Sequence, residues 1–97
     1  MPMYAQLAKL TAEGAKNIKY FGDQFERSSK ETEAKAGVKV KSAYATLGPY
    51  DLMFIIEAPN YEAALKASLF FTSMGIAQIE TWTLVPIEHF GKIAAQL

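Results

Sequence analysis

The segment that most constrains this fold is Leu52-Met53-Phe54-Ile55-Ile56, an unbroken apolar run in a chain of 97 residues. Successive side chains of a β-strand point to opposite faces of the sheet, so a strand made of this segment is apolar on both faces. Such a strand is central and is covered on both sides. The Gly48-Pro49-Tyr50-Asp51 sequence just before it predicts a turn, because proline presets φ and glycine tolerates unusual backbone angles.

The rest of the chain divides into strands and helices around this turn. Strand-type patterns predict further strands over residues 3–9, 38–47 and 76–85. Thr11 is the predicted cap of a first helix that ends at Gly37. Asn60 is the predicted cap of a second helix, which runs to about residue 74 and is closed by Gly75.

Two glycines lie inside the first predicted helix. Gly14 and Gly22 each cost about 1 kcal/mol relative to alanine at a helix interior position. A break near Gly22-Asp23 is therefore expected.

The order strand–helix–strand–strand–helix–strand is the ferredoxin-like motif of α+β proteins. Right-handed crossovers place both helices on one face of a four-stranded antiparallel sheet. We expect one domain over residues 1–97, with residues 87–97 as a C-terminal helical extension. The C-terminal helix is predicted because apolar residues after Pro86 recur near helical spacing, at Ile87, Phe90, Ala94 and Leu97.

The sheet face away from the helices needs its own cover, because an exposed apolar face is a large patch that soluble monomers avoid. Hydrophobic residues make up 51% of the sequence, which is high for so small a domain. We therefore predict a homo-oligomer, at least a dimer, that packs this face against the same face of a second subunit.

Charge and composition argue against several classes of function. The formal net charge is zero, which disfavours a large binding surface for DNA or RNA. The absence of cysteine excludes disulfides, a thiol nucleophile and a cysteine metal site. No apolar run approaches the roughly 20 residues that cross a bilayer, and no signal-peptide pattern is found. We expect a cytoplasmic protein without membrane partner, metal or cofactor.

Tyr50 and Asp51 are the first candidate site residues. Their phenol and carboxylate would bind a polar ligand at the rim of the sheet. The structural interpretation is that Asp51 accepts backbone N–H groups at the turn while Tyr50 packs across the hairpin. Turns use aspartate routinely in this way, so the structural interpretation is favoured.

A second set of candidate site residues lies on the predicted strands over residues 3–9 and 76–85. Tyr4 and Gln6 share one strand face, and Glu80 and Trp82 share another with Gln78. If the two sets converge, they form an aromatic pocket with a few polar groups, the usual form of a small-molecule site. Near Trp82 and beneath a partner subunit, Glu80 would then have a raised pKa and act as a general base.

Other interpretations of this set stay open. Glu80 would instead pair with a lysine at the rim of a dimer, or the set would face water. Tyr44 could join this set because it is aromatic. It shares its strand face with Val38 and Val40, however, which favours a position on the sheet face that the helices cover. A period of two fixes which residues share a face and not which face is inward.

His89 is the only histidine, so one chain offers no multi-histidine metal site. A haem ligand or a general base is conceivable for it, but a polar residue on the last helix is favoured. The sequence has no G-x-S-x-G elbow, no G-x-G-x-x-G and no P-loop.

Several of these segments together resemble the GYD-domain family, which is named for its Gly-Tyr-Asp turn. Here Pro49 stands between Gly48 and Tyr50. The resemblance covers the chain up to about Val85, and the segments that carry it are Met1-Pro2-Met3-Tyr4, residues 10–19, Gly48-Pro49-Tyr50-Asp51 and residues 56–60. It implies a dimeric α/β barrel and no established reaction. Related barrels include cofactor-free monooxygenases, haem-handling enzymes and amino-acid-sensing domains, which is analogy from fold alone.

Two functional hypotheses follow. The first is a non-catalytic dimer that binds a small molecule or serves as an assembly module. The alternative is a cofactor-free or haem-assisted monooxygenase-like enzyme, with Tyr4, Glu80, Trp82 and His89 as possible acid, base and aromatic wall.

Overall fold

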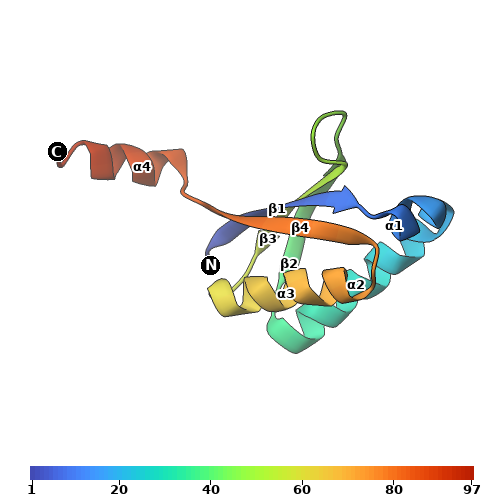
Figure 1. Ribbon diagram of the computed structural model, residues 1–97. Helices are drawn as coiled ribbons and strands as arrows, with labels where there is room; N and C mark the ends of the chain where they lie inside the picture. Colours follow the sequence, from blue (N-terminus) through green and yellow to red (C-terminus); the bar gives the residue numbers. More distant parts are fainter.

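The computed structural model describes residues 1–97 and contains one four-stranded sheet with helices. The strands lie in the order β2-β3-β1-β4 and every neighbouring pair is antiparallel, so the predicted ferredoxin-like α+β fold is confirmed (Figure 1). The elements are β1 (Met3–Leu10), α1 (Ala12–Lys16), the 3-10 turn η1 (Ile18–Tyr20), α2 (Phe21–Ala36), β2 (Lys39–Ala45), β3 (Leu52–Glu57), α3 (Tyr61–Ser73), β4 (Ala77–Leu84) and α4 (Ile87–Ala94).

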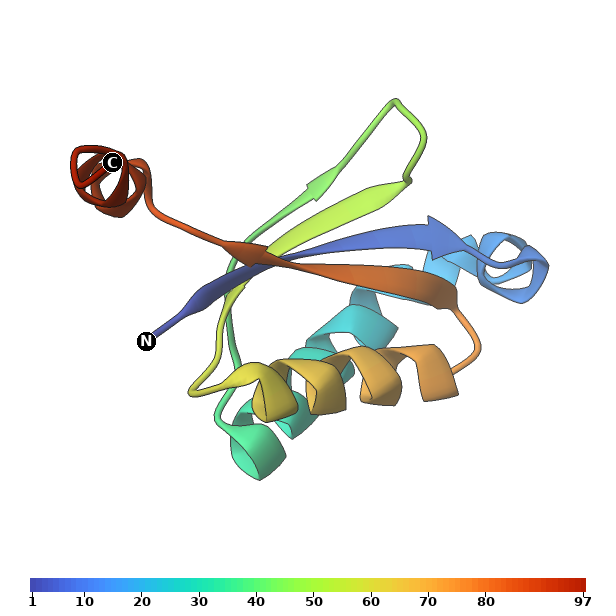
Figure 2. The ribbon, with the colours of Figure 1, turned by 60° about the vertical axis from the view of Figure 1, so that its left-hand side comes forward.

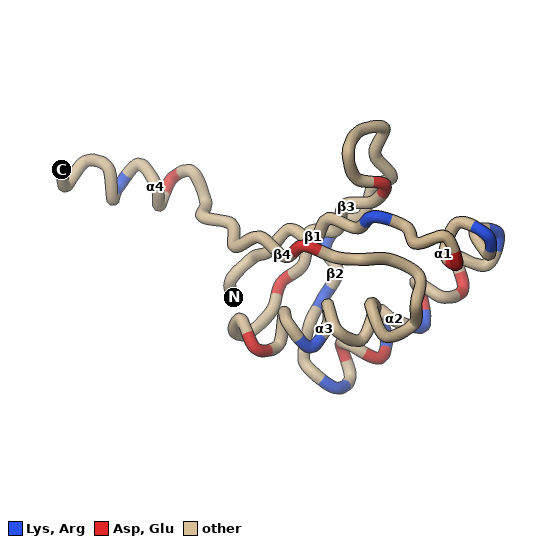
Figure 3. Tube along the Cα trace, viewed as in Figure 1, with Lys and Arg blue, Asp and Glu red and all other residues tan.

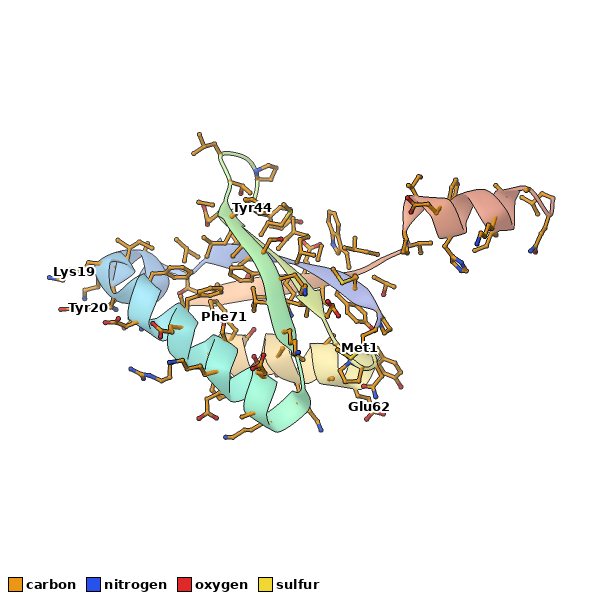
Figure 4. All side chains as sticks on the ribbon, turned by 180° about the vertical axis from the view of Figure 1, so that it is seen from behind. Met1, Lys19, Tyr20, Tyr44, Glu62 and Phe71 are labelled. Atoms are coloured by element: carbon orange, nitrogen blue, oxygen red, sulfur yellow. The ribbon has the colours of Figure 1, made fainter.

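Helices α2 and α3 cover one face of the sheet, and the core lies between them and the strands (Figure 2). Phe54 is at its centre, with its ring 5.1 Å from that of Phe25 and 5.7 Å from that of Phe71. Figure 4 shows Phe71 on this side of the sheet. β3 is central, as its double apolar pattern predicts, and β2 is an edge strand that carries Lys39 and Lys41.

The caps predicted from the sequence are present. The side chains of Thr11 and Asn60 accept hydrogen bonds from the backbone N–H groups of Gly14 and Ala63, at 3.0 and 2.9 Å. Gly37 and Gly75 have φ values of 70° and 76°, the left-handed conformation that glycine adopts without a steric penalty.

The first helix breaks earlier than predicted, at Asn17 instead of Gly22. The Asn17 side chain donates a hydrogen bond to the Glu13 carbonyl at 3.0 Å, a local bond that competes with continued helix. The chain then passes through η1 before α2 begins at Phe21. The expected break was therefore misplaced by a few residues because the asparagine, and not the glycine, ends α1.

A register shift between Val40 and Ser42 changes the face of the residues that follow in β2. Val40 stays against the core, whereas Tyr44 lies opposite Met53 on the other face of the sheet (Figure 4). The sequence pattern favoured the helix side for Tyr44, and this was wrong, because the irregularity reverses the alternation.

The last helix, α4, projects away from the rest of the chain (Figure 1). The radius of gyration is 14.5 Å, compared with about 12.5 Å for a compact domain of this length. None of the residues of α4 is buried. No helix here combines the length and the apolar character that crossing a membrane requires.

Candidate functional site

The sheet face away from α2 and α3, here called the outer face, carries the candidate site. The register brings Tyr44, Met53, Leu7 and Glu80 into one row across the four strands. The adjacent row contains Ser42, Ile55, Ala5 and Trp82. The face is therefore apolar at its centre, with aromatic residues and one carboxylate toward its edges.

The end of the loop between β2 and β3 is attached to β1 at one end of this face. The Asp51 backbone N–H donates to the Ala8 carbonyl at 2.9 Å, and the Leu10 N–H donates to the Asp51 carboxylate at 2.8 Å. These two bonds attach the loop to β1, which lies between β3 and β4 in the sheet. Tyr50 is thereby placed above β1, where it can reach across to β4.

Tyr50, Glu80 and Trp82 form one hydrogen-bonded cluster on the outer face. The Tyr50 hydroxyl donates to one oxygen of the Glu80 carboxylate, and the Trp82 indole N–H donates to the other at 3.0 Å. The Tyr50 and Trp82 rings meet edge to face, with their centroids 6.5 Å apart. We call these three residues the Tyr50–Glu80–Trp82 cluster.

The hydrogen bonds set the protonation of this cluster. The bond from Tyr50, and then that from Trp82, holds the pKa of Glu80 below its ordinary value. The same bond to Glu80 raises the pKa of Tyr50, with smaller contributions from desolvation and from the carboxylate charge. In the single chain, the donors that favour the charged form of Glu80 therefore outweigh desolvation. The raised pKa that we expect for Glu80 beneath a partner subunit stays a prediction.

The cluster is suited to recognition more than to proton abstraction. Glu80 is an ionised acceptor whose two oxygens each hold one neutral donor, which leaves lone pairs free for a third partner. The ion pairs of the chain are Lys30–Glu26, Lys35–Glu31 and Lys41–Glu57, so none of them neutralises Glu80. A carboxylate flanked by two aromatic rings attracts a cationic group.

Tyr4 and Gln6 do not join the cluster. Tyr4 is 5% exposed within the helix-side core, and Gln6, also 5% exposed, lies among core residues and donates to Thr81 at 3.4 Å. Both side chains are on the face opposite Glu80 and Trp82, so the predicted convergence does not occur. The sequence did contain a signal for the correct orientation of this strand. Lys9 shares a strand face with Ala5 and Leu7, and a lysine indicates the face away from the core, so Tyr4 and Gln6 belong to the core face.

The structure separates the roles of the two turn residues. Asp51 accepts the N–H of Leu10 and so has the structural role that the sequence favoured, although its partner is in β1 and not in the turn itself. Tyr50 reaches beyond the hairpin to Glu80. His89 lies exposed on α4 and away from the cluster.

The sequence interpretation missed an apolar stripe on α3. Tyr61, Leu65 and Leu69 are 71%, 52% and 57% exposed, and a spacing of four residues places them on one side of the helix. Figure 3 shows many charged residues along α1 and α2 and others spread over the strands, α3 and α4, while the loop between β2 and β3 is uncharged up to Asp51. The four-residue spacing of these apolar residues was the available signal in the sequence. A buried helix face has the same spacing, so the pattern did not distinguish an exposed stripe from the core.

Comparison with known proteins places the chain in a family. Residues 4–94 match the GYD domain. A relative from Thermus thermophilus is described as a glutamine synthetase and cystathionine beta-lyase binding protein. It is 31% identical over 87 residues, which is 90% of this chain and 92% of the relative.

The chain therefore belongs to the GYD-domain family, as its sequence resemblance predicted. The match also extends beyond Val85, where we placed the limit of the resemblance, and includes α4 as far as Ala94. The projecting helix is thus part of the matched domain.

Proposed function

We propose that this GYD-domain protein is a non-catalytic binding protein that forms a homodimer through its outer face and binds other proteins. The observation that carries the proposal is the outer face, which neither α2 nor α3 covers and in which an apolar centre lies between Tyr44 and Trp82. In this centre Met53 and Ile55 are half-buried, while the smaller exposed fractions of Ala5 and Leu7 are 4% and 9%. The relative from Thermus thermophilus, named for binding two enzymes, supports the protein-binding part.

The total surface supports a partner for this chain. Its accessible surface is 6544 Å², whereas folded monomers of 10.7 kDa expose about 5,500 Å² by the usual scaling with mass. The excess of about 1,000 Å² is close to the roughly 800 Å² that each partner contributes to a specific interface.

The α3 stripe is the proposed contact for partner proteins. Tyr61, Leu65 and Leu69 lie on the helix side of the sheet, so they stay exposed when two outer faces pair. Glu62 and Lys66 border the stripe and give it a polar rim. A dimer would present two such stripes, one on each side, which suits a protein that brings partner enzymes together.

The partner proposal is tested with purified glutamine synthetase and cystathionine β-lyase from the source organism, by calorimetry or surface plasmon resonance. We expect binding that the double substitution Leu65→Glu with Leu69→Glu weakens by at least about tenfold, because two apolar contacts are replaced by charges. Glu33→Gln, an exposed position on α2 outside the stripe, is the control. Absence of binding to both enzymes, or equal binding by the stripe variant, would contradict the proposal.

A small-molecule role is the second candidate, and the Tyr50–Glu80–Trp82 cluster favours it. Its ionised carboxylate between two rings would take an organic cation with an apolar part, such as an arylalkylamine. Thermal-shift measurements with tyramine and with arginine test this, with Glu80→Gln as the variant. The candidate predicts stabilisation of the wild type that the glutamine variant lacks, and no stabilisation by either amine would refute it.

The geometry gives less support to the monooxygenase-like alternative. The groups assigned to it are dispersed, because Tyr4 is in the core, His89 is on α4 and only Glu80 and Trp82 are in contact. The lowered pKa of Glu80 also makes it a weaker base than an ordinary glutamate.

A further inference from the structure

Helix α4 has an apolar side on which no residue is buried by its own chain. Ile87, Phe90 and Ile93 are 74%, 57% and 47% exposed, and Leu97 just beyond the helix is fully exposed. At 3.6 residues per turn these side chains lie along one side of the helix, while Glu88 and Lys92 lie on the other. The helix has 8 residues, and isolated helices shorter than about 12 residues are marginal in water, so α4 needs a surface to pack on.

We propose that α4 packs on a second copy of this chain and so acts as an exchanged arm of the dimer. The proposal rests on the outer-face dimer proposed above and deepens it. Figures 1 and 2 both show α4 on the side of the sheet opposite α2 and α3, which is the side that a second copy would occupy. An arm that leaves toward the partner is positioned to contact it.

The area that a stable dimer buries supports a second copy of this chain as the partner of α4. A sheet of four strands about 4.8 Å apart, with about seven residues of 3.3 Å rise per strand, has a flat footprint of about 440 Å². A specific interface needs roughly 800 Å² of accessible surface from each partner. The apolar side chains of α4 add about 60–120 Å² of accessible surface each, so the outer face and the arm together offer an area of the size that a specific interface uses.

Symmetry indicates where on the second copy α4 would lie. α4 follows the end of β4 at which Leu84 pairs with Met3, whereas the β2–β3 loop joins the opposite end of the sheet, at which Leu52 pairs with Ala8. A two-fold axis that lies between the faces and runs diagonally to the strands exchanges both the two ends and the two edges of the sheet. This rotation brings α4, which follows the β4 edge, to the β2–β3 loop of the other copy.

The β2–β3 loop has the chemistry to receive an apolar helix. Residues 46–50 carry no charge, and Leu47 at the tip is fully exposed, so the loop offers apolar surface without a desolvation cost for an ion. Figure 2 shows the loop rising on the same side of the sheet as α4. Each dimer would contain this contact twice.

Analytical ultracentrifugation of four proteins tests the inference. They are the wild type, an arm variant (Phe90→Glu with Ile93→Glu), a control on the polar side of the same helix (Glu88→Gln with Lys92→Gln) and an outer-face variant (Ile55→Glu). We expect dimers for the wild type and the polar control. The arm variant should raise the dissociation constant at least about 100-fold, because each substitution removes a buried apolar side chain from both copies.

The outcomes separate the arm from the sheet interface. A dimeric arm variant together with a monomeric Ile55→Glu protein overturns the arm and leaves the outer-face dimer standing. A monomeric wild type overturns both. Because no residue of α4 is buried, the arm variant should keep the circular dichroism signal of the sheet and of α2 and α3 and lose at most that of the 8 residues of α4. Loss of the dimer is thereby distinguished from unfolding of the domain.

Cross-linking tests the position of the arm. The chain has no cysteine, so a Phe90→Cys copy and a Leu47→Cys copy that differ in mass by a tag can be mixed and oxidised. We expect a disulfide between the two copies, and none when Lys66→Cys on α3 replaces the loop variant. A cross-link to position 66 and not to position 47 would refute the loop as the receiving surface.

Discussion

Gly14 gives the sharpest stability prediction, because sequence and structure assign opposite signs to its replacement by alanine. As a residue inside a helix, glycine costs about 1 kcal/mol relative to alanine, so Gly14→Ala would stabilise the fold. In the structure, a Cβ added at Gly14 would lie 2.0 Å from the carbonyl oxygen of Ile76 and 2.9 Å from its carbonyl carbon. Glycine is present here because α1 approaches the backbone before β4 closely.

The magnitude follows from what must move. Ordinary contacts of a Cβ begin at 3.4 Å, so a Cβ at Gly14 and the Ile76 oxygen, 2.0 Å apart, must separate by more than 1 Å. The same oxygen accepts the Thr11 N–H at 2.9 Å, and this bond would be strained as α1 retreats. Overpacking costs about 1–3 kcal/mol and a lost hydrogen bond about 0.5–1.5 kcal/mol. The better helix propensity of alanine offsets about 1 kcal/mol of this cost. We therefore expect Gly14→Ala to lower the free energy of unfolding by about 2 kcal/mol.

Gly22→Ala is the matched control. A Cβ added at Gly22, in the first turn of α2, meets nothing within 4 Å. Only the conformational preference of the backbone changes there, so this variant should gain up to about 0.5–1 kcal/mol. The two substitutions are chemically identical and differ only in what surrounds the new methyl group.

Urea unfolding followed by circular dichroism measures the change in free energy of unfolding for both variants. The protein concentration is kept the same in all experiments, because the midpoint of a dimer depends on it. A loss of about 2 kcal/mol corresponds to a fall of roughly 8–16 °C in melting temperature for a domain of this size. If Gly14→Ala unfolds at the same or a higher midpoint than the wild type, the close approach of α1 to Ile76 is not the reason for glycine.

The remaining predictions concern the loop and the cluster. Asp51→Ala should cost about 1–3 kcal/mol in urea unfolding, because the Leu10 N–H loses its acceptor. Tyr50→Phe should raise the pKa of Glu80 toward its ordinary value, which the fluorescence of Trp82, the single tryptophan, would report as an acid transition at higher pH. In the wild type, the stability from ionised Glu80 should be present above its unfolded pKa and be lost as pH falls through the lowered folded pKa. The stability from neutral Tyr50 should be lost only as pH rises through its raised pKa, which denaturant midpoints measured across the alkaline range check.

The sequence predicts the elements well because their signals are local. Thr11 and Asn60 bond to N–H groups three residues away, and Gly37 and Gly75 adopt left-handed angles that few other residues accept. The double apolar pattern of residues 52–56 likewise needs no knowledge of the partner strands to indicate a central position. These features are decided within a few residues of chain.

The site was harder to predict because its contacts are not local. Tyr50 and Glu80 are 30 residues apart in sequence and meet only because the Tyr50 side chain reaches past β1 to Glu80 on β4. Tyr4 and Gln6 were assigned to the wrong face, since alternation gives two equivalent solutions and only the packing of α2 and α3 chooses between them. The register shift in β2 carries no glycine or proline to mark it, so the face of Tyr44 could not be predicted from residue type.

The outer face and its carboxylate together restrict what a partner face must offer. Paired sheets lie about 10 Å apart, so pairing the outer faces would remove Glu80 from bulk water. A buried ionised carboxylate is costly unless it is paired, and Tyr50 and Trp82 supply only neutral donors. A dimer of this kind must therefore keep water beside Glu80 or supply a cation to it, from a ligand or from the second copy. A dry interface there would instead protonate Glu80, and dimer formation would then strengthen as pH falls toward its pKa.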